Sequence, residues 1–83
     1  MPMFFVYVIR SLKDGRFYTG QTNDFERRLM EHNTGQGLVR YTKNKGPWVV
    51  VLVEEFSTRS AAVKREKYLK TGVGRDFIKS LGK

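Results

Sequence analysis

The sequence predicts an α/β (α+β) sandwich with a three-stranded antiparallel sheet, flanking helices and the element order ββαβαα. Two runs on either side of a turn in residues 4–22 have the composition of a β-hairpin, and residues 48–56 have that of a third strand. Between and after these strands, hydrophobic side chains recur at the 3.6-residue spacing of helices. The chain has 83 residues, so we expect residues 1–83 to form one domain.

The hairpin is the first predicted element. Its strands, Phe4–Arg10 and Arg16–Thr22, are rich in aromatic and β-branched residues, and Asp14-Gly15 is a strong turn signal between them. Because side chains alternate between the two faces of a sheet, one face is expected to pack on the core, and it carries Phe4, Val6, Val8 and Phe17.

Each strand of the hairpin carries one tyrosine. If Arg10 pairs with Gly15 across a four-residue loop, Tyr7 lies directly opposite Tyr18 and both phenols project from one face. A shift of one residue would place them on opposite faces, so this prediction depends on the register. Two amphipathic tyrosines at a sheet edge are the simpler interpretation of this pair, and a functional pair is the alternative.

The next segment predicts a helix that runs to about His32. Residues 23–26 have the pattern of a capping box, with Asn23 as N-cap and Glu26 at the third position. One face of this helix carries Phe25, Arg28, Leu29 and His32. Phe25 and Leu29 are expected to pack, with Arg28 and His32 beside them, one turn apart. Arg27 and Glu31 are expected to form a separate ion pair at the surface.

Residues 35–47 are predicted to form a loop that carries Arg40, Tyr41, Lys43 and Lys45. Basic side chains interleaved with an aromatic one suit a surface that grips the nucleic-acid backbone and stacks on bases, and a solvated loop explains the same pattern. The third strand, Trp48–Phe56, is apolar on both faces. We therefore expect it to be central, with helices on both faces of the sheet.

A carboxylate interrupts the hydrophobic stripe of the following helix, which is capped by Ser57 or Thr58 and runs to about Thr71. The stripe consists of Ala62, Glu66, Leu69 and Val73, so Glu66 stands where a leucine is expected. An unpaired carboxylate is costly to bury. Glu66 is therefore expected beside a cation, at a metal, at the mouth of a cleft, or on a solvated helix face.

Two glycines are expected to end that helix at residues 72–74. A short terminal helix, Arg75–Leu81, is predicted to follow, with Phe77, Ile78 and Leu81 facing inward.

The composition points to a polyanion as partner. Sixteen Lys and Arg against eight Asp and Glu give a net charge of +8, which favours DNA or RNA over an acidic membrane surface, with a basic surface that serves only solubility as the alternative. The absence of cysteine and the single histidine exclude disulfides and zinc sites built from Cys or His clusters. The longest apolar run, Trp48–Val53, is too short for a membrane span, and the N-terminus lacks the pattern of a secretory signal, so we expect a cytoplasmic protein.

Together these residues resemble the GIY-YIG nuclease superfamily, in its small single-domain bacterial branch of stand-alone endonucleases. Phe5-Val6-Tyr7 stands in place of the first triplet, and Tyr18-Thr19-Gly20 in place of the second, with its tyrosine eleven residues after Tyr7. The resemblance extends from about Phe4 to Leu81. Phe5, Val6 and Thr19 replace a Gly and two Ile of the family, which affects backbone packing more than chemistry, and Gln21 stands where some members have a lysine.

The resemblance implies catalytic roles for Tyr7, Tyr18, Arg28, His32 and Glu66. Glu66 would hold a Mg²⁺ or Mn²⁺ that keeps most of its waters, and Arg28 would bind the phosphate as a planar fork. Tyr7 would be the general base or a proton relay, and as a base it needs a pKa below the ordinary value near 10. Tyr18 would orient the water or the phosphate. His32 would be a proton shuttle or a phosphate ligand, with a helix-end hydrogen bond as its structural alternative.

The function implied is a metal-dependent DNA endonuclease that hydrolyses phosphodiester bonds, with structure-selective cleavage in DNA repair or recombination as the narrower form. We expect DNA as partner, branched or damaged DNA included, and no membrane; a protein partner is left open. The candidate DNA-binding residues are Arg27, Arg40, Tyr41, Lys43, Lys45 and Lys70. The competing function is a non-catalytic nucleic-acid-binding module on the same scaffold.

Overall fold

A three-stranded sheet with three helices makes up the described part of the protein, residues 3–34 and 47–81 of a computed structural model. The elements are β1 (Phe4–Ser11), β2 (Phe17–Thr22), α1 (Phe25–Thr34), β3 (Trp48–Phe56), α2 (Arg59–Leu69) and α3 (Gly72–Leu81). The strands are antiparallel and lie in the order β2-β1-β3. The predicted fold class and element order are therefore confirmed. None of these helices has the length and hydrophobicity of a membrane span.

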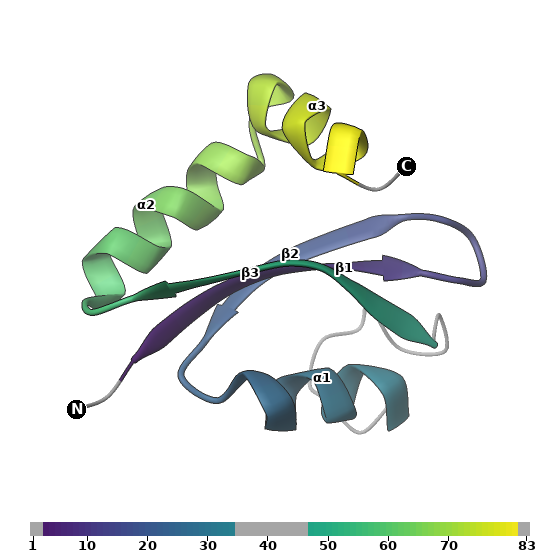
Figure 1. Ribbon diagram of the computed structural model, residues 1–83, viewed down its shortest axis with the longest axis horizontal. Coiled ribbons are helices and arrows are strands. Elements are labelled where there is room, and N and C mark those ends of the chain that lie inside the picture. Colours follow the sequence, from purple (N-terminus) through teal and green to yellow (C-terminus); the bar gives the residue numbers. More distant parts are fainter. Residues whose placement is uncertain (1–2, 35–46, 82–83) are drawn as a thin grey trace.

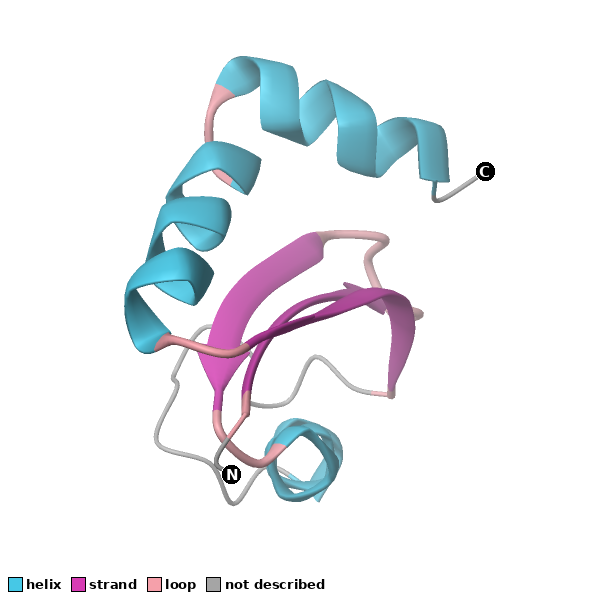
Figure 2. Cartoon of the chain, turned by 60° about the vertical axis from the view of Figure 1, so that its left-hand side comes forward, coloured by secondary structure: helices cyan, strands magenta, loops and turns pink. Residues whose placement is uncertain are grey.

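The helices cover both faces of the sheet. α1 lies on one face, and α2 and α3 lie on the other, as Figures 1 and 2 show. Alternate side chains of the central strand β1 therefore enter two different hydrophobic clusters. The cluster under α2 and α3 is built on Val6, Val8, Ala62, Leu69 and Ile78, with Phe4 and Phe17 against it. The cluster over α1 is built on Tyr7, Ile9 and Trp48, with Tyr18, Phe25 and Leu29 against it. The predicted core face of the hairpin and the packing of Phe25 and Leu29 are confirmed.

The hairpin has a different register from the predicted one. Tyr7 pairs with Gly20 and Ile9 with Tyr18, so the two tyrosines are diagonal neighbours and not direct partners. The turn starts one residue later than expected, because the Ser11 hydroxyl accepts hydrogen bonds from the amides at positions 13 and 14, and Gly15 lies inside the turn with a φ of 77°. The pairing shifts by two residues, so both tyrosines still share one face.

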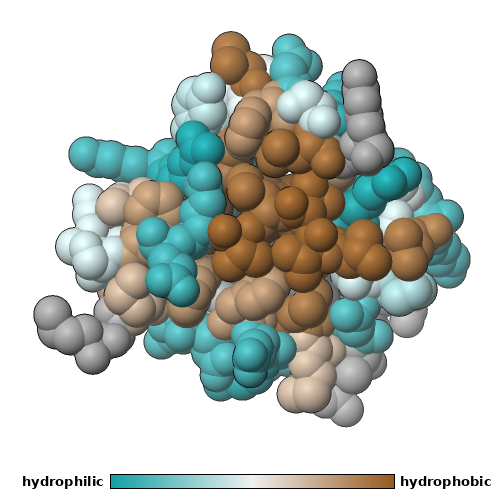
Figure 3. Space-filling view, viewed as in Figure 1, coloured by the Kyte–Doolittle hydropathy of each residue, from teal (hydrophilic) through white to brown (hydrophobic). Residues whose placement is uncertain are grey.

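Strand β3 has the predicted bounds, but its predicted central position is wrong. β1 lies between the other two strands, and β3 forms one edge of the sheet. Val49, Val50 and Val53 are 40%, 43% and 38% exposed. Figure 3 shows hydrophobic side chains gathered across the centre of the face that is seen there. Other side chains of β3 pack in the two hydrophobic clusters, namely Trp48, Val51, Leu52 and Phe56, and this packing does not require a second neighbouring strand.

Short polar side chains set the helix starts. Asp24, and not Asn23, caps α1, since its Oδ1 atom accepts a hydrogen bond of 3.2 Å from the amide of Arg27. The Thr22 hydroxyl accepts a hydrogen bond of 3.1 Å from the amide of Asp24, which fixes the link between β2 and α1. Thr58 caps α2 by accepting from the amide of Ala61, so one of the two predicted caps is confirmed.

The last two helices meet at a glycine. α3 starts at Gly72 rather than at Arg75, and a Cβ atom on the buried Gly74 would overlap the backbone at the end of α2. The buried positions of α3 are therefore Gly74 and Ile78, four residues apart. The inward positions predicted for Val73, Phe77 and Leu81 are wrong, because these side chains are 67%, 38% and 43% exposed.

Candidate active site

Tyr7 and Tyr18 meet over the edge strand β2. Their ring centroids are 6.2 Å apart, and the ring of Phe25 from α1 lies 5.6 Å from that of Tyr7. Tyr7 is 1% exposed and crosses Gly20, where a Cβ atom would lie 2.7 Å from its hydroxyl oxygen. Any larger residue at position 20 would push the phenol away. Gly20 therefore allows a side chain of the central strand to reach the edge of the sheet.

Both tyrosines are held in their neutral form. Burial is the main cause that raises the pKa of Tyr7 well above its ordinary value, and the neighbouring Tyr18 adds to it. The charge of Arg28 and its hydrogen bond to the phenol lower the pKa of Tyr7 by less than burial raises it. Burial also raises the pKa of Tyr18, against the charges of Lys70 and Arg28. The base role predicted for Tyr7 requires a fall in pKa, and its surroundings give a rise.

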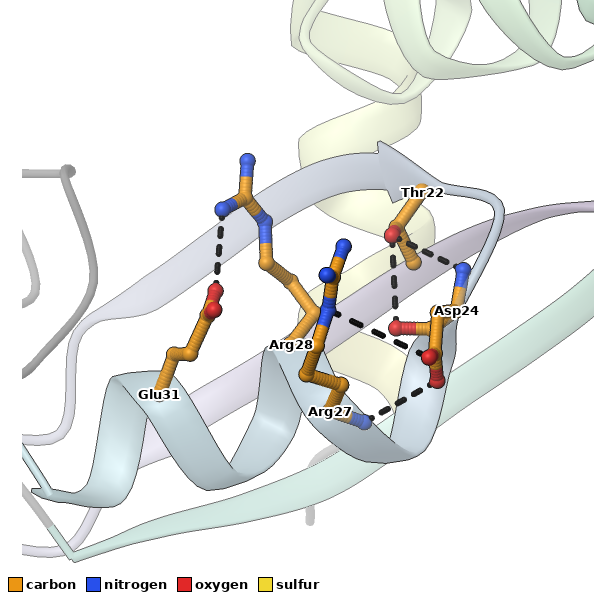
Figure 4. Close-up of polar contacts among 5 residues, drawn as sticks. All are labelled: Thr22, Asp24, Arg27, Arg28 and Glu31. Carbon is orange, nitrogen blue, oxygen red and sulfur yellow. Dashed lines mark hydrogen bonds and ion pairs between the residues drawn. The ribbon is translucent and has the colours of Figure 1, made fainter.

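Arg28 projects from the first turns of α1 toward this pair of phenols. Its Nη1 atom donates a hydrogen bond of 3.1 Å to Oε1 of Glu31, one turn further along the helix (Figure 4). The hydrogen bond raises the pKa of Arg28, so the guanidinium remains charged. The Arg28 side chain is 32% exposed, so solvent and ligands reach it. The ion pair that we predicted between Arg27 and Glu31 is wrong, since Glu31 pairs with Arg28 and Arg27 pairs with Asp24 at 3.9 Å.

Glu66 reaches the site from α2, on the other face of the sheet. The Nζ atom of Lys70 lies 2.9 Å from its Oε2 atom. The side chain of Glu66 is only 19% exposed, and that of Lys70 is 54% exposed. Of the environments predicted for Glu66, the structure therefore shows the one beside a cation. A solvated helix face does not agree with the low exposure of Glu66. The charge of Glu66 contributes to the raised pKa of both Tyr7 and Tyr18. The carboxylate therefore acts on the same edge of the sheet as the phenols.

The donor set around Glu66 limits the kind of metal site that is possible. Among the described side chains of residues 3–34 and 47–81, which do not include that of His32, no three His, Cys, Asp or Glu gather at one place. Mg²⁺ is commonly bound by one or two carboxylates, with waters and substrate phosphates as the other ligands. A single carboxylate fits a cation of that kind and does not fit a metal held by the protein alone. Such a cation would take the place of Lys70 as the partner of Glu66.

The other predicted site residues fall into two groups. Lys70 is the C-cap of α2 beside Glu66, and Arg27 lies exposed on α1, next to Arg28 in the chain. The backbone of His32 is part of α1. The His32 side chain lies outside the described part of the structure, as do the four loop residues Arg40, Tyr41, Lys43 and Lys45.

Three contributors to the site were missed in the sequence. Gly20 is the last residue of the second triplet, and the diagonal pairing of the tyrosines is what gives it a role. Glu31 was assigned to the wrong arginine, although its i,i+3 spacing from Arg28 is a recognised helix pair. Arg59, at the start of α2, joins Arg27 and Arg28 in an open pocket of about 230 Å³ at the end of β2. No local signal links Arg59 to α1, because the fold alone brings them together.

Comparison with known proteins identifies the family. The model of the GIY-YIG catalytic domain matches residues 3–77. A UPF0213 protein of Staphylococcus saprophyticus is 44% identical over 71 residues, which cover 86% of this chain and 84% of that protein. A UPF0213 protein of Haloquadratum walsbyi is 45% identical over 67 residues, which cover 81% of this chain and 73% of that protein. The solution NMR structure of a UPF0213 protein from Bacillus halodurans superposes with a TM-score of 0.56 and 32% identity, over 95% of this chain and 84% of that one. The chain therefore belongs to the GIY-YIG nuclease superfamily and is similar to its small UPF0213 proteins.

Proposed function

We propose that this protein is a metal-dependent DNA endonuclease of the cytoplasm, which hydrolyses phosphodiester bonds at the edge of β2. One observation carries the proposal. Tyr7, Tyr18, Arg28 and Glu66 come from four different elements, and the charges of Arg28 and Glu66 act on the pKa of both phenols. A carboxylate, a guanidinium and two phenols in one place supply the groups that phosphodiester hydrolysis needs.

Arg28 is proposed to bind the phosphate that is cut. Its Nη1 atom is engaged by Glu31 and the guanidinium also hydrogen-bonds the phenol of Tyr7, so the remaining N–H groups are those that phosphate oxygens would contact. Glu31 limits the rotamers of the long side chain and thereby orders the fork before substrate binds. The fixed positive charge then stabilises the additional negative charge that develops on the phosphate in the transition state.

Glu66 is proposed to hold Mg²⁺ or Mn²⁺ together with the substrate. The cation, when bound, supplies Lewis-acid chemistry at the phosphate and at the leaving oxygen. Glu66 exchanges Lys70 for this new partner, which frees the Lys70 ammonium for contact with the DNA backbone. The pair therefore holds the carboxylate in place until substrate arrives.

The tyrosines are proposed to orient the attacking water and to relay its proton. Their raised pKa values leave both hydroxyl groups protonated at neutral pH, so each can donate one hydrogen bond and accept another. Tyr7, which is hydrogen-bonded to the guanidinium of Arg28, is proposed to accept the proton of the water while its own proton passes to an oxygen of the phosphate. His32 is kept as a further candidate for proton transfer or phosphate binding.

The second candidate function is a DNA-binding module without catalysis. It is favoured by two observations: Glu66 already has a cationic partner, and the pKa of Tyr7 is raised. A binding module has no need for a carboxylate in a basic protein, so the endonuclease is the preferred proposal.

Nicking of supercoiled plasmid, with Mg²⁺, with Mn²⁺ and with EDTA, tests the proposal. We expect cleavage that requires the cation and that is lost in Glu66→Gln. A parallel series of flaps, forks, four-way junctions and plain duplex tests the narrower proposal of structure-selective cleavage in repair or recombination. Binding to all of these substrates with no cleavage under any cation would favour the binding module.

A further inference from the structure

An open groove of about 550 Å³ lies between β2 and α3, next to the candidate active site. Its floor is formed by Phe17 from β2, Leu69 from α2 and Ile78 from α3, and Tyr18 borders it from the opposite face of the sheet. Tyr18 belongs to both places, because its ring also faces Tyr7. A ligand that lies in the groove would therefore extend directly into the site.

The rim of the groove is basic. Arg16, Lys70, Arg75 and Lys79 line it, and none of the lining residues is acidic. In the described ranges, no carboxylate forms an ion pair with Arg75 or Lys79, and Arg16 has only the exposed Asp14 at 3.8 Å. Lys70 is paired with Glu66, so two of the four cations lack an ion-pair partner within residues 3–34 and 47–81. Four cations around a concave surface favour a ligand with several negative charges.

The floor and the rim together distinguish between kinds of nucleic acid. A duplex presents its phosphates and keeps its bases stacked, so binding it needs the cations and leaves an aromatic floor unused. A single strand offers bases for stacking on aromatic rings while its phosphates contact a basic groove. We propose that this groove takes an unpaired nucleotide of single-stranded DNA next to the scissile phosphate. The proposal deepens the proposed function and rests on it for the position of that phosphate.

The other end of β2 fits the path of such a strand. The open pocket lined by Arg27, Arg28 and Arg59 borders Gln21, Thr22 and Asn23, whereas the groove borders residues 16–19. Gly20, under the phenol of Tyr7, lies between the two sets. Three guanidinium groups suit phosphates, which carry charge without a stacking surface. One strand along β2 would therefore place a base in the groove, the scissile phosphate at Tyr7 and Arg28, and the following phosphate near Arg27 and Arg59.

Binding measured without cleavage tests the groove. Fluorescence anisotropy in EDTA would compare a labelled single strand with a blunt duplex of the same sequence. The wild-type protein is expected to prefer the single strand by about tenfold. The double variant Arg75→Gln/Lys79→Gln should bind the single strand about tenfold more weakly, and its log–log salt dependence should lose roughly 0.7 for each phosphate contact removed.

A matched control removes the same charge elsewhere. Lys64→Gln/Lys67→Gln also lowers the net charge by two, on exposed positions of α2 that do not line the groove. We expect this variant to change affinity for the single strand by about twofold at most. An equal loss in the control, or an equal loss of duplex and single-strand binding in the groove variant, would overturn the proposal.

Amide chemical shifts provide a second readout on the unaltered protein. Addition of a hexamer of thymidine should shift the amides of Phe17, Thr19, Arg75 and Lys79, and unchanged signals at these positions would overturn the assignment. The two proposals also fail differently. If the protein cleaves DNA with a cation and the groove variant binds normally, only the groove proposal is wrong. If the groove binds a single strand and no cleavage occurs, only the endonuclease proposal is wrong.

Discussion

Two glutamates, Glu54 and Glu66, form ion pairs that involve α2, and the two pairs are built differently. Glu54 on β3 receives two hydrogen bonds from Arg65, at 2.7 and 3.2 Å, and the guanidinium lies 5.3 Å from the ring centre of Tyr68 and 5.7 Å from that of Phe77. Glu66 receives one hydrogen bond, of 2.9 Å, from a lysine one turn along its own helix. The first pair joins β3, α2 and α3, whereas the second joins nothing outside α2.

The difference separates a structural carboxylate from one that is available for function. A bidentate pair between elements holds both side chains in one geometry, and separating it leaves two charges without partners. A lysine on a flexible stem, 54% exposed, can leave at little cost. Both glutamates are partly buried, so burial alone does not distinguish them. The geometry of the cationic partner does.

The largest expected effect comes from Glu66→Gln. Loss of the charge that holds the cation should reduce cleavage by about 10³-fold or more. The lost i,i+4 pair is worth only about 0.3–0.5 kcal/mol, so the melting temperature should fall by no more than about 2–4 °C. DNA binding should persist or tighten, because a negative charge has been removed. Plasmid nicking and thermal unfolding of the same preparation measure both effects.

Glu55→Gln is the control for this substitution. It removes a carboxylate from an exposed position of β3 and should change neither cleavage nor stability noticeably. A folded Glu66→Gln protein that still cuts DNA in a cation-dependent way would remove Glu66 from the proposed mechanism.

Arg28→Lys tests whether the geometry of a guanidinium matters as well as its charge. Arg65 uses two of its nitrogens on one carboxylate, whereas Arg28 divides its hydrogen bonds between Glu31 and Tyr7 and keeps further N–H groups for phosphate. Lysine keeps the charge and loses the fork, so we expect cleavage to fall by roughly 10²-fold with little change in DNA affinity. Arg27→Lys makes the same change at the preceding residue and serves as the control, so it should change cleavage by about threefold at most. Equal rates for the two variants would mean that Arg28 contributes only charge.

Glu54→Gln should have the opposite profile. The variant loses a charged, bidentate hydrogen bond that is partly solvent-exposed, which is worth about 1–2 kcal/mol. The midpoint of urea unfolding should decrease accordingly, while cleavage at a temperature where the protein is folded stays within about twofold. A double-mutant cycle with Arg65→Gln isolates the pair from other effects of each change. Unchanged stability, or loss of cleavage in a stable variant, would contradict the structural role of Glu54.

Most of the fold was predictable because its signals are local. The apolar run Trp48–Phe56 has the bounds of β3, and the hydroxyl of Thr58 caps α2 as its position suggests. The hairpin register was not predictable from the pattern of strand residues, since it depends on two hydrogen bonds to the Ser11 hydroxyl and on Gly15 inside the turn. The edge position of β3 also escaped, because burial by helices and burial by strands produce the same apolar sequence.

The residues of the candidate site could be selected from the sequence, but their hydrogen-bond and ion-pair partners could not. The spaced tyrosines, Arg28 and Glu66 could be selected because the family's motifs fix their positions. Their partners could not: Glu31 is within reach of both Arg27 and Arg28 on a helix, and only the structure chooses between i,i+3 and i,i+4. The basic groove joins residues 16–19 to residues 69–79, which become neighbours only in the folded chain.

The smallest effect, absent at neutral pH, concerns Tyr7. Its pKa is raised in the folded state, so the folded protein keeps the phenol proton at pH values where the unfolded chain has lost it. The stability that this provides is complete below about pH 10 and is lost above it, by up to about 1.4 kcal/mol per pH unit. Urea unfolding between pH 8 and pH 11.5 should therefore show the wild type losing stability faster than Tyr7→Phe above about pH 10. Of the two glutamates, only Glu66 contributes to the raised pKa, so Glu66→Gln should lower the pH at which the folded protein releases the Tyr7 proton, and Glu54→Gln should leave that pH unchanged. Parallel curves for the wild type and Tyr7→Phe would mean that the phenol ionises as freely in the folded protein as in the unfolded chain.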